Sequence, residues 1–264
     1  MIVNSEFVAC AEMYIEQLQQ QGKMESAKNQ TSALRRFLTF LGEKEIPFKD
    51  FDEVLVRNYH TWLERQQIGA NTISVYMRNL KHLYQKVVAA REPSTQNAFE
   101  NITTIYRAKQ DHNALSLNEL KILYHLDLSK ERPIVGMARD FFLFAVLGQG
   151  MTGGDILYLT SDNIHQDRLT YTVQATGKEV TVPLLHEMRK IIARNHSPES
   201  PYFFPLITAT DPEERWKQHG LLLQKINRQL HKLGDLLGLS FSLNLTVAKY
   251  SWDEALLDSW LSKL

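Results

Sequence analysis

The chain has 264 residues, of which 44% are hydrophobic, and its 30 basic and 30 acidic side chains give a formal net charge of zero. The length allows one large domain or two modest ones, and the charge balance excludes a broadly basic protein, so any contact with DNA is expected to be a local patch. The single cysteine, Cys10, excludes an internal disulfide. With no recognisable signal peptide and no apolar stretch of membrane-spanning length, a cytoplasmic protein without a membrane partner is expected.

The N-terminal part carries four segments in which apolar residues recur with the period of a helix. Side chains that favour helix caps, glycines that favour helix ends, and one proline indicate where each segment begins and ends. In chain order, the expected helices run from Ser5 to Gly22, from Glu25 to Gly42, from Asp52 to a break at Gly69, and from a cap at Asn71 or Thr72 to a point before Pro93. Four helices of this size predict an independent bundle.

The C-terminal part mixes helices with a short β-hairpin. The segment from Glu92 to Asn113 is polar without a clear period, which predicts a linker, and Ser116 with Glu119 forms a capping box that starts a second domain. The further expected elements are a buried helix from Met137 to Leu147, a short helix after Thr152, a hairpin closed at Thr176 and Gly177, a helix from Leu184 to Ala193, a helix from Asp211, and a last helix after Asn244. The predicted fold is therefore mainly α with a small antiparallel sheet.

The stretch from Gly150 to Leu184 resembles the start of the catalytic domain of tyrosine recombinases, the phage integrase family. Gly150–Met151, Asp155–Ile156, Leu159 and Asn163–Ile164 have the spacing of that family's motif, and a hairpin follows them. Weaker similarities occur in family order at Gly69–Leu83, Asn97–Glu100 and Leu115–Leu120. The resemblance implies a SAM-like core-binding bundle at residues 1–92, a linker at 93–113, and a recombinase-like domain at 114–264 that stops at Leu264, before the family pattern is complete.

The resemblance also implies that the catalytic groups have been replaced. In the family, arginines, a histidine and a lysine stabilise the charge that develops on a DNA phosphate while a tyrosine attacks it. The matching positions in this chain hold Thr152, Ala175, Thr246 and Lys249, and no tyrosine follows Tyr250. No intact catalytic set is therefore expected.

Two other motifs have less specific interpretations. Thr152-Gly-Gly-Asp155 could cradle a phosphate, but it lacks the lysine and the glycine spacing of a nucleotide-binding loop, so a helix N-terminus is the better interpretation. The nine histidines show no metal-binding spacing. Neither a metal nor a cofactor is expected.

The candidate DNA-binding residues lie on two of the N-terminal helices. They carry short hydrogen-bonding groups or positive charges and are Asn71, Thr72, Ser74, Arg78 and Lys81 on the fourth helix, with Lys28 and Arg35 on the second. A solvated face explains this pattern as well as a DNA-binding face does. The resemblance favours DNA, because the fourth helix reads the major groove in that family.

The sequence thus predicts a protein similar to integrases that binds double-stranded DNA, is associated with integration and recombination, and does not cleave DNA. The resemblance adds a second copy of the chain, or a recombinase, as an expected partner. The alternative is a helical protein-interaction module that has lost DNA binding, which the neutral net charge permits.

Overall fold

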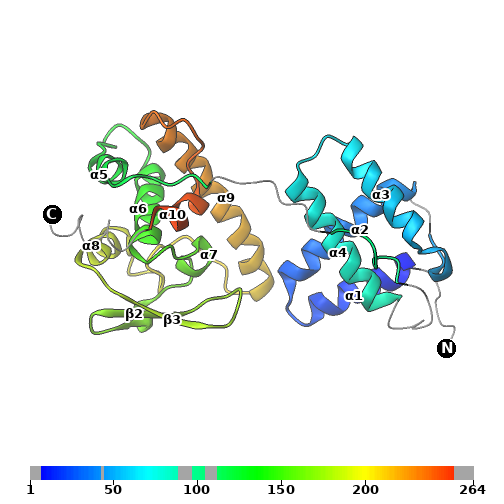
Figure 1. Ribbon diagram of the computed structural model, residues 1–264. Coiled ribbons are helices and arrows are strands. Elements are labelled where there is room, and N and C mark those ends of the chain that lie inside the picture. The colour runs from blue at the N-terminus through cyan, green and yellow to red at the C-terminus, as the bar shows by residue number, and fades with distance from the viewer. Residues whose placement is uncertain (1–6, 43–44, 89–96, 105–111, 253–264) are drawn as a thin grey trace. The chain divides into compact units, whose positions relative to one another are not determined.

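The computed structural model describes residues 7–42, 45–88, 97–104 and 112–252, which form two compact units, Met1–Gln110 and Asp111–Leu264 (Figure 1). Both units are mainly helical, and the second contains a small antiparallel sheet. The fold class predicted from the sequence is confirmed. The predicted cap at Ser5 and much of the predicted linker lie outside the described residues.

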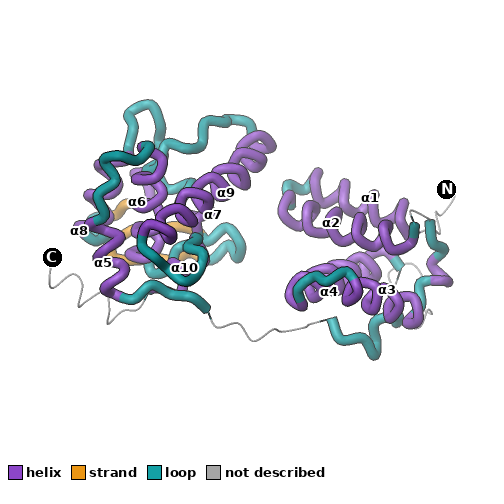
Figure 2. The backbone as a smooth tube through the Cα atoms, turned by 90° about the horizontal axis from the view of Figure 1, so that it is seen from above, coloured by secondary structure: helices purple, strands orange, loops and turns teal. Residues whose placement is uncertain are grey.

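Unit 1 is a bundle of four α-helices around an aromatic core. The helices are α1 (Phe7–Gln20), α2 (Met24–Leu41), α3 (Glu53–Arg65) and α4 (Ala70–Val87), with a 3-10 turn at Phe48–Asp50. Figure 2 shows α1 and α2 side by side in one layer and α3 and α4 in another. Rings from both layers meet in the core, where Phe37 lies 5.0 Å from Tyr59 and 5.5 Å from Phe51 between ring centroids.

Local capping explains where these helices begin and end. Asp52 accepts a 2.8 Å hydrogen bond from the backbone N–H of Leu55, and Gly42 ends α2 at a φ of 69°, which favours glycine. The prediction that Asn71 or Thr72 caps the fourth helix is wrong. The helix begins at Ala70, because the carbonyl of Gly69 already accepts hydrogen bonds from the N–H groups of Thr72 and Ile73.

Part of the segment predicted as a linker belongs to the core of unit 1. Ala98 and Phe99 are each only 1% exposed. The Phe99 ring lies 5.5 Å from that of Tyr84, whose hydroxyl accepts a hydrogen bond from the N–H of Ala98. The expectation of a linker is wrong for these residues, because two apolar side chains in a polar segment are enough to anchor it.

Unit 2 is built around the buried helix α6. Its helices are α5 (Leu117–His125), α6 (Pro133–Leu147), α7 (Gly153–Ile156), α8 (His186–Asn195), α9 (Pro212–Leu236) and α10 (Leu245–Ser251). The predicted capping box is present, since Ser116 and Glu119 bond each other's backbone N–H groups. Within α6, Asp140 is buried and accepts two hydrogen bonds from Arg194 and one from Asn195, which ties α6 to α8.

The sheet of unit 2 has the order β1-β2-β3, with all neighbours antiparallel. The strands are β1 (Ile164–His165), β2 (Arg168–Thr172) and β3 (Glu179–Pro183). Leu169 pairs with Val182, and both are buried in the core of the unit. On the opposite face, Thr170 pairs with Thr181, and their hydroxyls lie 2.9 Å apart. This alternation fixes the register, because a shift by one residue would expose the apolar pair.

We expect the substitution Phe99→Ala to lower the free energy of unfolding of unit 1 by about 3–5 kcal/mol, as for other buried aromatic side chains. Urea unfolding followed by tyrosine and tryptophan fluorescence measures the change. Glu100→Ala is the control, because Glu100 is the exposed neighbour of Phe99. Equal stabilities of the two variants would show that this segment does not contribute to the core.

Candidate nucleic-acid interface

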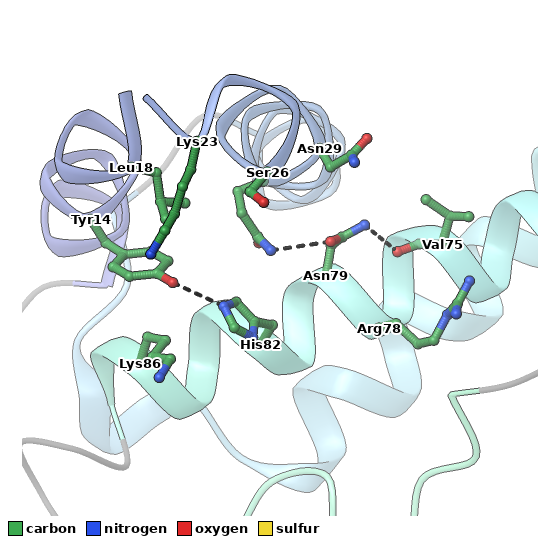
Figure 3. Close-up of a pocket in the computed structure, with 11 residues that line it drawn as sticks. Tyr14, Leu18, Lys23, Ser26, Asn29, Val75, Arg78, Asn79, His82 and Lys86 are labelled. Atoms are coloured by element: carbon green, nitrogen blue, oxygen red, sulfur yellow. Dashed lines mark hydrogen bonds between the residues drawn. The ribbon is translucent and has the colours of Figure 1, made fainter. Parts of the chain in front are cut away.

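A polar pocket of about 700 Å³ opens between α1, α2 and α4 of unit 1 (Figure 3). Side chains from all three helices and from the turn between α1 and α2 line it. They are Tyr14, Leu18, Lys23, Ser26, Asn29, Gln30, Val75, Arg78, Asn79, His82 and Lys86. We call this the α4 pocket, because α4 contributes five of these residues.

Hydrogen bonds join the three helices across the floor of the α4 pocket. The hydroxyl of Tyr14 on α1 lies 2.9 Å from Nε2 of His82 on α4. Gln30 on α2 donates from Nε2 to Oδ1 of Asn79 at 3.1 Å, and Asn79 donates from Nδ2 to the carbonyl of Val75 at 2.9 Å. All three contacts are drawn as dashed lines in Figure 3. Polar side chains are therefore held in place at the bottom of an open pocket.

The pocket is positively charged. Lys23, Arg78 and Lys86 line it, and none of the described lining residues is an aspartate or a glutamate. Burial lowers the pKa of His82 below its ordinary value of 6.5, and the neighbouring charge of Lys86 lowers it further. His82 is therefore neutral at pH 7, and the two lysines and the arginine provide the charge. Such a site suits an anion flanked by hydrogen-bonding groups.

The sequence predicted seven DNA-binding residues, and the structure places them differently. Asn71, Thr72, Arg78, Lys28 and Arg35 are exposed. Of these, only Arg78 lines the α4 pocket, and Lys28 lies 3.9 Å from Glu25 in an exposed ion pair.

The other two predicted residues are less accessible. Lys81 is half-buried and does not line the pocket. Ser74, expected on the exposed face, is only 4% exposed. It lies between Ile73 and Met77 on the buried stripe of α4, so a direct contact with DNA is excluded by its position.

Sequence reasoning missed most of the residues that make the pocket. Tyr14, Lys23, Gln30 and Lys86 were not singled out, and Gln30, although polar, is only 6% exposed. These residues come from separate segments, and only tertiary packing brings them together. The sequence does indicate a polar face on α4 that includes Asn79 and His82, and Lys86 continues that face for another turn.

In unit 2, the residue at the family's first arginine position has a structural role. Thr152 caps α7, accepting a hydrogen bond from the N–H of Asp155 and donating one to its Oδ2 at 2.7 Å. The other carboxylate oxygen of Asp155 accepts from the N–H of Gln174 at 3.0 Å. Asp155 therefore links the start of α7 to the hairpin that follows it. The expectation that Thr152 opens a helix is confirmed.

Close backbone packing brings the loop before Thr152 and the residue Lys249 into the same region, and the resemblance predicts that the positions of Thr152 and Lys249 are catalytic in the family. Gly150 has a φ of 76°, and a Cβ atom built on it would lie 3.1 Å from the Cα of Lys249 and 3.3 Å from its carbonyl oxygen. The loop that leads to Thr152 therefore lies directly against α10. A Cβ on Gly153 would lie 2.6 Å from Cδ1 of Leu245 and 3.0 Å from Cδ2 of Leu223, so a larger residue here would require these two leucine side chains to move.

The remaining positions are open to solvent. Ala175, Thr246 and Lys249 are exposed. Lys249 Nζ lies 5.9 Å from the centre of the Tyr250 ring, and that ring stacks on His112 at 3.9 Å with an angle of 6° between the planes. Of the four positions, only Lys249 offers a positive charge to a phosphate.

A second polar pocket, of about 500 Å³, lies where α9 meets α10. Thr246 lines it together with Gln224, Asn227, Arg228, His231 and Asn244. Asn227 is already engaged there, because its Oδ1 accepts a 2.9 Å hydrogen bond from the N–H of Leu245. Arg228 and His231 are exposed, so they add two nitrogen-bearing side chains beside the replaced histidine position.

Within the described residues, no group of three or more His, Cys, Asp or Glu side chains is arranged to hold a metal ion. In the same part of the chain, no helix is long and apolar enough to cross a membrane.

Comparison with known proteins supports the family resemblance. The family model of the phage integrase SAM-like domain matches residues 6–106, nearly all of unit 1. No curated protein matches the sequence.

Solved structures extend the likeness to the whole chain. A lambda integrase (75–356) dimer bound to a COC′ core site has a TM-score of 0.64 at 14% identity, covering 93% of this chain and 87% of that one. A lambda integrase tetramer bound to a Holliday junction has a TM-score of 0.64 at 15% identity, with coverages of 93% and 71%. The Tn1549 transposon integrase with a circular intermediate DNA has a TM-score of 0.59 at 12% identity, with coverages of 95% and 87%. The resemblance to tyrosine recombinases predicted from the sequence is confirmed, and at these identities the structural likeness establishes the fold.

The contact of Gly150 with Lys249 predicts a large effect of one added methyl group. A left-handed backbone costs alanine ~1–2 kcal/mol, and the clash with a fixed backbone adds ~1–3 kcal/mol. We expect Gly150→Ala to destabilise unit 2 by the sum of both, measured by urea unfolding. Gly177→Ala is the matched control, since Gly177 has a φ of 67° and open space around it. An equal loss of unfolding free energy in the two variants would show that the contact between Gly150 and Lys249 is not close enough to clash with a methyl group.

Proposed function

We propose that this chain, a phage integrase SAM-like domain followed by a unit with the tyrosine recombinase fold, binds double-stranded DNA without cleaving it. The observation that carries the proposal is the α4 pocket, where three positive side chains surround the hydrogen-bonded amides of Gln30 and Asn79, with no carboxylate among the described lining residues. Positive side chains supply most of the affinity for DNA, and amides supply hydrogen bonds to bases.

A net charge of zero does not exclude DNA binding, because the positive charges at the α4 pocket are concentrated in one place. Lys23, Arg78 and Lys86 lie around one opening, whereas several acidic side chains elsewhere are already paired. Glu53 accepts from Arg57, and Glu187 accepts from Lys190. A duplex that meets the α4 pocket is therefore attracted by a positive patch, and screening weakens repulsion from acidic groups beyond about 10 Å at 0.1 M salt.

Loss of cleavage follows from the four replaced positions. Removing one donor that stabilises transition-state charge typically lowers the rate by a factor of roughly 100 to 1,000. Thr152, Ala175 and Thr246 carry no charge, and the hydroxyl of Thr152 is engaged by Asp155. Lys249 keeps a charge but cannot grip a phosphate with the two-pronged geometry of arginine.

The proposed DNA binding also involves protein partners and takes place in the cytoplasm. Because lambda integrase is seen as a dimer and as a tetramer on DNA, we propose that this chain meets a second copy, or a recombinase of similar fold, on DNA in the cytoplasm. In that setting, a protein that occupies the site without cutting it would regulate integration or recombination.

We expect weak, salt-sensitive binding of the chain to a mixed-sequence duplex, with a log–log salt slope of roughly −3 to −5 for about four to six neutralised phosphates. The double substitution Arg78→Ala and Lys86→Ala should flatten this slope by about two units. Fluorescence anisotropy of a labelled 30-base-pair duplex between about 20 and 200 mM salt measures it.

The matched control is Lys49→Ala with Arg65→Ala, which removes two exposed charges of unit 1 that do not line the pocket. A slope that changes equally in both double variants would contradict a role for the α4 pocket. No binding of the parent protein at low salt would favour the alternative, a helical protein-interaction module.

We expect a supercoiled plasmid to stay supercoiled when incubated with the chain, because three of the four catalytic positions lack a charge. Agarose electrophoresis after protease treatment measures relaxation, and denaturing gels of an end-labelled duplex detect a covalent adduct. Either relaxation or an adduct above the level of a preparation without the protein would overturn the proposed loss of cleavage.

A further inference from the structure

We propose that Gln30 on α2 reads the major-groove edge of one adenine in the bound duplex and so sets a sequence preference. This inference rests on the proposed DNA binding at the α4 pocket. It begins with the direction of the hydrogen bonds at the floor of that pocket.

The carbonyl of Val75 fixes that direction. A backbone carbonyl only accepts hydrogen bonds, so the side-chain group of Asn79 that lies 2.9 Å from it is the donor, Nδ2. Oδ1 of Asn79 therefore faces Gln30, and the atom of Gln30 that contacts it at 3.1 Å is the donor Nε2. The other end of the Gln30 amide is then an acceptor, Oε1.

That acceptor is unsatisfied. Oε1 of Gln30 is buried and has no hydrogen-bond partner among the residues that the structure describes, although Gln30 lines the α4 pocket and is 94% buried as a residue. Buried polar atoms in folded proteins are nearly always paired, and an exception calls for an explanation. A ligand that brings a hydrogen-bond donor to Oε1 would satisfy this acceptor.

Adenine is the base that matches Gln30. Its major-groove edge presents an amino donor at N6 beside an acceptor at N7, and a glutamine amide bonds both at once. Guanine presents two acceptors, thymine presents an acceptor and a methyl group, and cytosine presents a donor alone. When Gln30 turns to adenine, Oε1 accepts from N6 and Nε2 donates to N7. Asn79, which is half-buried, then exchanges its contact with Gln30 for water.

The positive side chains near Gln30 also favour a DNA duplex as the ligand. Arg78 lies on α4 one residue before Asn79, and Lys23 precedes α2. Both line the pocket, so phosphates on either side of the base that is read would have positive partners. Phosphate contacts position a duplex, and base contacts then select its sequence.

The test is selection of duplexes with a randomised central segment of ten base pairs by the full chain at low salt, followed by sequencing. We expect adenine, which makes up about a quarter of each randomised position, to be enriched at one position by at least about twofold over the unselected pool. Gln30→Met has a similar volume and no amide, and should abolish that enrichment while leaving the salt slope on mixed-sequence duplex unchanged. Gln85→Met, at an exposed position of α4 outside the pocket, should keep the enrichment.

Thermal unfolding shows whether Gln30→Met folds. If it does not, a second variant still tests the role of Gln30. Gln30→Glu offers only acceptors and should move the preference at the same position from adenine to cytosine. Binding without any adenine preference, or a preference that survives in Gln30→Met, overturns the role of Gln30 and leaves the proposed DNA binding intact. Absence of binding to every duplex overturns both.

Discussion

The packing of α4 against both α1 and α2 is the constraint on which unit 1 depends. Its buried stripe, which includes Ile73, Met77 and Leu80, supplies the apolar contact. Along the edge of that stripe, His82 contacts Tyr14 and Asn79 contacts Gln30, so hydrogen bonds extend the interface toward solvent. The α4 pocket is thus the polar margin of the core, which explains why its amides are held in place although they lie at an opening.

Features determined by neighbouring residues could be predicted from the sequence. The capping box at Ser116 and the caps at Asp52 and Thr152 depend on side chains that bond a backbone N–H group three residues further along the chain, and all three are present. The small sheet was also predictable, because a turn at Gly177 joins two β-rich segments. The start of α4 was misjudged because the backbone of Gly69 makes the first helical hydrogen bonds without any side-chain cap.

Features determined by distant residues could not be predicted. Nothing near Phe99 in the sequence indicates that it completes a core formed with Phe51 and Tyr84. Gln30 and Ser74 are polar residues that tertiary packing buries, against their intrinsic preference. The closeness of Gly150 to Lys249, nearly a hundred residues apart in the chain, was accessible only through the family resemblance.

The fold of unit 2 does not depend on the catalytic groups that the family uses. Thr152 caps α7 with its hydroxyl, and Asp155 holds the hairpin through Gln174, so this connection needs no arginine. The approach of α10 depends on Gly150, whose missing side chain leaves space for the backbone of Lys249. Backbone packing and short polar bonds therefore keep the scaffold in place with uncharged side chains at Thr152, Ala175 and Thr246. Since the α4 pocket belongs to unit 1 and these three positions belong to unit 2, the proposed DNA binding and the proposed loss of cleavage rest on different residues and can be tested separately.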